Sequence, residues 1–130
     1  MGQQQLLLIA LGVIVVGLTI LVGMNVAATY SADANREAVG SDLLSITSLA
    51  RAHYFRPTAL GGGGYTFTNF RIPEGLDSNG HGVFEQIKTG HHSDHIHFLG
   101  TGTEIGEDGE QPIMIEVRYS LTETRFTKIN

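Results

Sequence analysis

Residues 6–24 read LLLIALGVIVVGLTILVGM, an unbroken apolar run in which Thr19 is the most polar residue. At a helical rise of 1.5 Å per residue, such a run reaches about 28 Å, close to the thickness of the hydrocarbon core of a bilayer. A helix that is apolar on all sides has to be buried in lipid or among other helices. The run therefore predicts either a membrane-spanning helix or the buried core of an assembly.

Charged side chains are missing from the first 32 residues, which contain no Asp, Glu, Lys or Arg. A cleaved secretory signal has a basic start and a shorter apolar core, so we expect the apolar helix to belong to the mature chain. Lys or Arg on the cytoplasmic side normally orients a single-pass anchor. Two explanations of its orientation stay open. Either a basic leader is removed, or Met1 is the translation start and the folded domain sets the orientation.

The remaining residues have the length of one small domain. The chain carries 13 acidic and 8 basic residues, for a formal net charge of −5, which argues against a nucleic-acid surface. It has no cysteine, which excludes disulfides, thiolate catalysis, iron–sulfur clusters and c-type haem attachment. We expect two parts, an apolar helix half over residues 1–32 and a globular head over residues 33–130.

One long helix is expected from residue 3 to residue 55, because no proline occurs before Pro57. It would extend about 80 Å, more than a small domain needs, so its apolar half should project. Its second half, assigned to residues 33–56, is amphipathic. One face carries the residues expected to pack on a sheet, which are Val39, Leu43, Ile46, Ala50 and Tyr54.

After the glycines at 61–64, the pattern changes to a period of two residues, which is typical of strands. We expect an antiparallel sheet of about four strands within residues 65–130, because the connections are short. The candidate strand segments are residues 65–70, 83–89, 94–99, 112–121 and 122–129. The predicted fold class is α+β, with the long helix packed on this small sheet.

This order of elements, with a short polar stretch leading into an apolar helix that becomes amphipathic and then a small antiparallel sheet, resembles the type IV pilin class. In that family the apolar helices form the filament core and the sheet domains form its surface. A basic leader is removed by a prepilin-type peptidase after a glycine. The resemblance implies a mature end at Gln3 if Gly2 is that glycine, or at Met1 otherwise.

Two features depart from the pilin pattern. Most members carry a glutamate near the mature N-terminus, where this chain has Gln3, Gln4 and Gln5. The proline that often interrupts the apolar helix is also missing, and glycines are expected to permit local bending or close helix packing instead. The expected assembly residues are Gln5, Leu6, Leu7, Leu8, Ile9, Leu11, Gly12, Val13, Ile14, Val16, Gly17, Ile20, Leu21 and Gly23.

Histidines and acidic residues gather at two places in the head. The only metal candidates among the histidines and their neighbours are His91, His92, Asp94, His95 and His97, but their spacing matches no known ligand pattern, and the solvent face of a strand explains them. The acidic residues Glu104, Glu107, Asp108 and Glu110 do not follow the EF-hand calcium pattern. We expect no metal site and no cofactor.

No catalytic motif is present, so we do not expect an enzyme. There is no Gly-x-Ser-x-Gly, and residues 61–64 lack the Lys-Ser/Thr that a phosphate-binding loop requires. The resemblance implies a structural subunit of an extracellular pilus-like filament, whose partners are identical subunits, the cytoplasmic membrane before assembly, and pilus-type assembly machinery. The alternatives are a single-pass membrane-anchored domain that does not polymerise and a minor pilin-like component of a secretion system.

Overall fold

The chain folds as one long N-terminal helix and a five-stranded antiparallel sheet, which confirms the α+β prediction. The computed structural model describes residues 2–87 and 94–130. The elements are α1 (Gly2–Phe55), the 3-10 helix η1 (Thr58–Leu60), β1 (Ser78–Asn79), β2 (Gly82–Ile87), β3 (His95–Ile105), β4 (Pro112–Ser120) and β5 (Thr124–Lys128). The strands follow one another in the order β1-β2-β3-β4-β5, so every connection joins neighbouring strands.

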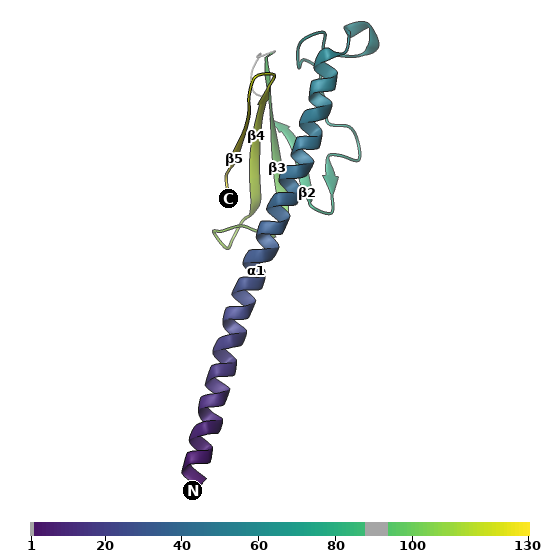
Figure 1. Ribbon diagram of the computed structural model, residues 1–130. Coiled ribbons are helices and arrows are strands. Elements are labelled where there is room, and N and C mark those ends of the chain that lie inside the picture. The colour runs from purple at the N-terminus through teal and green to yellow at the C-terminus, as the bar shows by residue number, and fades with distance from the viewer. Residues whose placement is uncertain (1, 88–93) are drawn as a thin grey trace.

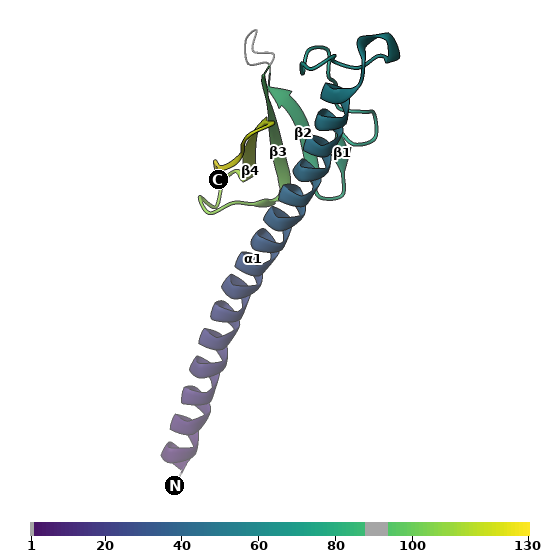
Figure 2. The same cartoon turned by 45° about the horizontal axis from the view of Figure 1, so that its top comes forward.

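The helix α1 is unbroken over 54 residues, and only its C-terminal half lies on the sheet. Its N-terminal half extends well below the sheet, as Figures 1 and 2 show from two directions. No element that the structure describes covers the other face of the sheet. The molecule is therefore a head of two layers with a bare helix projecting from it.

The core lies between this half of α1 and the inner face of the sheet. Val39, Leu43, Ile46 and Ala50 are buried there, and Tyr54 is partly buried against them. Alternate residues of the strands meet this helix face, and these are Phe84, Ile96, Phe98, Ile113, Ile115, Val117 and Tyr119. Thr47 is also buried, and its hydroxyl donates to the carbonyl oxygen of Leu44 at 2.7 Å. That bond satisfies the one polar side chain that the described core contains.

Glycines let β3 pass close under the helix. A β-carbon on Gly100 would lie 2.7 Å from Cγ1 of Val39 and 3.0 Å from Cδ1 of Leu43, closer than side chains normally pack. Gly102 is likewise buried on the same face, next to the side chain of Asn35. The strand predicted at residues 94–99 was too short: it stopped before Gly100, because glycine weakens strands on average. Here the glycines extend β3 to Ile105 by making room for α1.

The prediction of a strand at residues 65–70 is wrong. Tyr65 and Asn69 have φ angles of 67° and 63°, in the left-handed region that a strand cannot use. The N–H groups of Gly63 and Tyr65 donate to the carbonyl oxygens of His53 and Tyr54, each at 2.8 Å. The segment therefore folds back on the last turn of α1, where Phe67 and Phe70 still reach the core.

Two other differences concern the edges of the sheet. The two-residue strand β1 was not expected, and it pairs with β2 through Ser78 and Asn79. The expected strand at 83–89 corresponds to β2, which is described as far as Ile87. The expected strand at 122–129 is shorter, because the turn after Ser120 uses residues 121–123.

Candidate assembly surface

The projecting half of α1 presents large apolar side chains that no described residue covers. Leu7 is 69% exposed, Val13 68% and Leu21 61%. None of the most apolar window of α1 is buried, and the helix is long and apolar enough to cross a membrane. A single apolar surface of this extent is far larger than soluble monomers normally expose. A surface of this kind is suited to contact with lipid or with other apolar helices.

All fourteen expected assembly residues lie on this projecting half, and every one of them is exposed. The free energy gained by covering these side chains depends on the apolar area that is buried. Burial of apolar surface contributes about 25 cal/mol per Å², so burying a helix of this length contributes tens of kcal/mol relative to water. Lipid and identical apolar helices both satisfy this requirement. Burial of apolar area alone therefore does not favour helices over lipid, and a preference for helices would need close helix–helix packing.

The three glycines of the apolar run are open to contact, because a β-carbon built on Gly12, Gly17 or Gly23 meets nothing within 4 Å. Gly12 and Gly23 are separated by about three full turns, so they share one side of the helix together with Thr19. Gly17 lies about 140° away from Gly12, on another side. The hydroxyl of Thr19 donates to the carbonyl oxygen of Val15 at 2.8 Å, so it does not need an outside acceptor. These positions offer two sides at which a second helix can approach closely.

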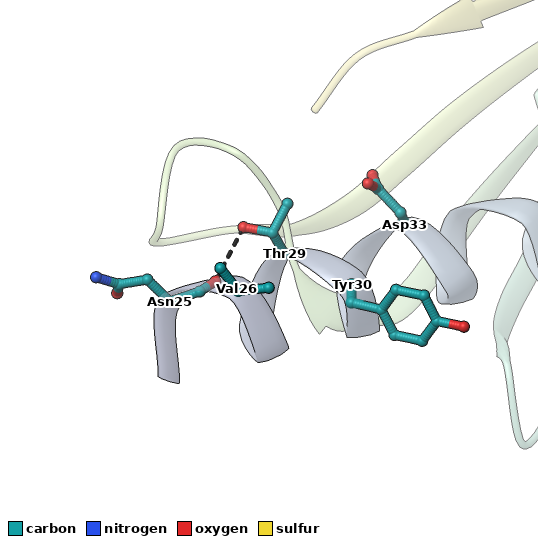
Figure 3. A pocket seen from close by; sticks show the side chains of 5 residues that line it. All are labelled: Asn25, Val26, Thr29, Tyr30 and Asp33. Carbon is teal, nitrogen blue, oxygen red and sulfur yellow. Dashed lines mark hydrogen bonds between the residues drawn. The ribbon is translucent and has the colours of Figure 1, made fainter. Parts of the chain in front are cut away.

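A polar band separates the apolar run from the head, and Figure 3 shows it along α1. Asn25, Val26, Thr29, Tyr30 and Asp33 line a shallow pocket there, and the hydroxyl of Thr29 donates to the carbonyl oxygen of Asn25 at 3.0 Å. The band lies where a membrane surface would meet a helix that leaves the bilayer. This band was not among the features expected from the sequence; the polar residues Asn25, Thr29 and Tyr30 after Met24 are the signal that could have found it.

Arg36 follows this band in α1. The sequence pattern gave no sign that its side chain is largely buried. Its Nη1 donates to a carboxylate oxygen of Asp33, while Nε and Nη2 are buried and have no hydrogen-bond partner among the described residues. Glu107, on the β3–β4 connection, lies 3.9 Å from Nη2 and is also paired with Lys128. This group of charges ties the lower end of the sheet to the helix.

Two polar contacts fix the helix to the sheet higher up. Oδ2 of Asp42 lies 2.7 Å from Nδ1 of His81 and accepts a hydrogen bond from Nδ2 of Asn79 at 2.9 Å. Burial by itself would raise the pKa of the Asp42 carboxyl, but the hydrogen bonds from Asn79 and His81 and the attraction of His81 outweigh it and hold this pKa below its ordinary value. The head is therefore held on α1 by more than apolar packing.

Of the histidine candidates, His95 and His97 lie on the open face of the sheet, on the side away from α1. His95 and His97 occur on one face of β3, with their rings 5.3 Å apart. Nδ1 of His95 is 2.8 Å from Asp94, and Nδ1 of His97 is 2.7 Å from Glu116. His91 and His92 lie outside the described residues. Within residues 2–87 and 94–130, no group of three His, Asp or Glu side chains is arranged to hold a metal ion.

Two of the acidic residues between β3 and β4, Glu107 and Asp108, have partners within the chain. Asp108 accepts hydrogen bonds from the backbone N–H groups of Gln111 and Glu110, which together with the side chain of Asn130 hold the pKa of Asp108 below its usual range. The ion pair with Lys128 does the same for the pKa of Glu107. These two carboxylates help to fix the connection between β3 and β4.

Comparison of the chain with protein-family models, with curated proteins and with solved structures found no match. The architecture is compatible with a pilin-like fold, since one long apolar N-terminal helix packs on an antiparallel sheet. The exposed helix and its unbroken connection to the head are the features that bear on function.

Proposed function

We propose that this chain is the repeating subunit of an extracellular, pilus-like helical filament that polymerises through the apolar half of α1. The observation that carries the proposal is the continuity of α1. One helix runs without interruption from an exposed apolar segment into the core of the head. A rigid connection of this kind transmits the packing of the helices directly to the position of each head, as a regular filament requires.

Before assembly, the apolar half would lie in the cytoplasmic membrane, and identical helices would replace the lipid as the subunit joins the filament. Helices gain little hydrophobic free energy by this exchange, because lipid tails are as apolar as leucine. Close contacts at small residues therefore have to favour the filament. The open positions of Gly12, Gly17 and Gly23 support this step. Pilus-type assembly machinery and a prepilin-type peptidase are the partners that the pilin resemblance implies.

A second candidate is a membrane-anchored domain that does not polymerise. It is favoured by the length and apolar composition of α1, which suit a single-pass anchor. A minor pilin-like component of a secretion system would share the same fold and be present in few copies. The unbroken helix favours the filament, because a simple anchor does not require a rigid connection between membrane and head.

Sedimentation after the membrane is dissolved separates these functions. Cells that produce the chain are sheared, the released material is treated with a mild detergent, and the fraction that sediments at high speed is measured. A filament stays sedimentable because its contacts are between proteins, whereas an anchored monomer is released into the supernatant. Complete release of the chain as a monomer from sheared material and from membranes would contradict the proposal.

A further inference from the structure

The open face of the sheet, on the side away from α1, carries an unusual pair of arginines. Arg118 of β4 and Arg125 of β5 are directly opposite each other in the antiparallel register. Both side chains point away from the core, because their neighbours Val117 and Tyr119 are buried on the inner face. Like charges placed directly opposite each other on neighbouring strands destabilise a sheet. We therefore expect the repulsion between the two arginines to lower the stability of the head.

The charges around this pair are only partly compensated. Glu123, in the turn between β4 and β5, forms an ion pair with Nη2 of Arg125 at 3.0 Å. Glu116 is held by His97, at 2.7 Å. Arg118 has no ion pair with any residue that the structure describes. The guanidinium group of Arg118 is exposed and therefore open to an anion from outside the chain.

The pair also lines a shallow depression. Arg118, Ser120, Glu123 and Arg125 form its walls, and the hydroxyl of Ser120 lies on the same outward face. In the register of β3 with β4, His97 is opposite Arg118, so one row across three strands reads His97, Arg118 and Arg125. Guanidinium groups bind carboxylate, sulfate and phosphate oxygens with two parallel hydrogen bonds.

We propose that this row, called here the arginine row (His97, Arg118 and Arg125), binds the acidic groups of an anionic polysaccharide. An oxyanion between the two guanidinium groups removes their mutual repulsion and supplies the acceptor that Arg118 lacks. Binding of a long polymer rests on the proposed function, because a filament would repeat the arginine row along its outer surface. Many weak contacts would then bind a long polymer together, because each further contact is intramolecular.

The side chains of this face favour a polysaccharide over nucleic acid. On the described outward faces of β3, β4 and β5, no Phe, Tyr or Trp side chain is available to stack on bases. A sulfated polysaccharide has no bases to stack and is bound through its oxyanions, which guanidinium groups suit.

The test uses the full chain in detergent on immobilised dextran sulfate, with neutral dextran as the matrix control. We expect binding to dextran sulfate that weakens with salt, and little binding to neutral dextran. Arg118→Ala and Arg125→Ala should each lower the affinity about tenfold, as expected for loss of one charge-assisted contact. Arg71→Ala is the matched control, since Arg71 is also exposed but lies outside the sheet, and it should leave binding unchanged.

Four results would overturn the proposal. These are no binding to dextran sulfate, equal binding by the chain and by the Arg118→Ala/Arg125→Ala double variant, tighter binding to DNA than to dextran sulfate, and complete competition by inorganic sulfate at equal concentration of sulfate groups. Circular dichroism of each variant shows whether the head is still folded, and Arg118→Lys/Arg125→Lys should restore part of the binding. Because dispersed chains are used, a failure here is separate from a failure to form filaments.

Discussion

Asn35 of α1 accepts a hydrogen bond from the backbone N–H of Thr103 of β3 at 3.1 Å. The same side-chain oxygen accepts from the N–H of Glu104 at 3.3 Å, and Nδ2 donates to the carbonyl oxygen of His81 at 2.9 Å. One side chain thus joins the helix to β3 and to the turn between β1 and β2. This contact lies where the projecting half of α1 leaves the head.

Replacing Asn35 by alanine should destabilise the head. The change removes the hydrogen bonds to the N–H of Thr103 and the carbonyl of His81, which are exposed and can bind water instead, so we expect a loss of about 1 kcal/mol in the free energy of unfolding. Denaturant unfolding of the full chain in detergent, followed by far-ultraviolet circular dichroism, measures it. Ser48→Ala is the control. It removes an exposed hydroxyl bound only within the helix, and its effect should stay within about 0.5 kcal/mol.

A larger side chain at Gly100 should also destabilise the head. In Gly100→Val, the added carbons meet Val39 and Leu43 of α1, and overpacking of this kind costs about 1–3 kcal/mol. Gly80→Ala is the matched control, because a β-carbon there meets nothing within 4 Å. Equal unfolding midpoints for the two variants would mean that α1 does not lie so close to β3.

Acid should weaken the head partly through Asp42. Its pKa in the folded state is below the ordinary value of 3.8, so the unfolded chain binds the proton more tightly. The stabilisation is therefore complete above that value and is lost as the pH falls through the folded pKa. Asp42→Asn should lower stability near pH 6 and have a much smaller effect near pH 2.5. The same loss at both pH values would show that the Asp42 carboxylate makes no pH-dependent contribution.

Close helix packing predicts different outcomes for two substitutions at Gly17. Gly17→Leu should reduce filament formation while leaving the head folded, because the leucine keeps a neighbouring helix at a greater distance. Gly17→Ala keeps a small side chain and raises helix propensity, so it should still assemble. Sedimentation of sheared material measures both variants. Normal filament yield from Gly17→Leu would show that assembly does not need close packing at this glycine.

Much of the fold was predictable because α1 obeys local rules. The spacing of Val39, Leu43, Ile46 and Ala50 places them on one helix face, and these side chains are buried. The alternation of Ile113, Ile115 and Val117 marked β4 equally well. In these segments the periodicity of apolar residues and the tertiary packing agree.

The remaining differences come from contacts between segments distant in the sequence. The left-handed conformation of Tyr65 goes with the hydrogen bond from its N–H to the carbonyl oxygen of Tyr54 at the end of α1, and no local pattern encodes that contact. Gly100 lengthens β3 only because a helix lies above it. The burial of Arg36 and the opposition of Arg118 and Arg125 depend on register, which the sequence pattern does not determine.

Electron cryo-microscopy of material sheared from cells tests the central claim most directly, with mass spectrometry of the subunit's N-terminus on the same sample. The account predicts filaments built from this chain, with the apolar half of α1 packed in the centre and the sheets on the outside. The mass would show whether the mature chain starts at Met1 or at Gln3. Sheared material that contains no such filament, with the chain remaining in the membrane as a monomer, would contradict the account and favour the anchored domain.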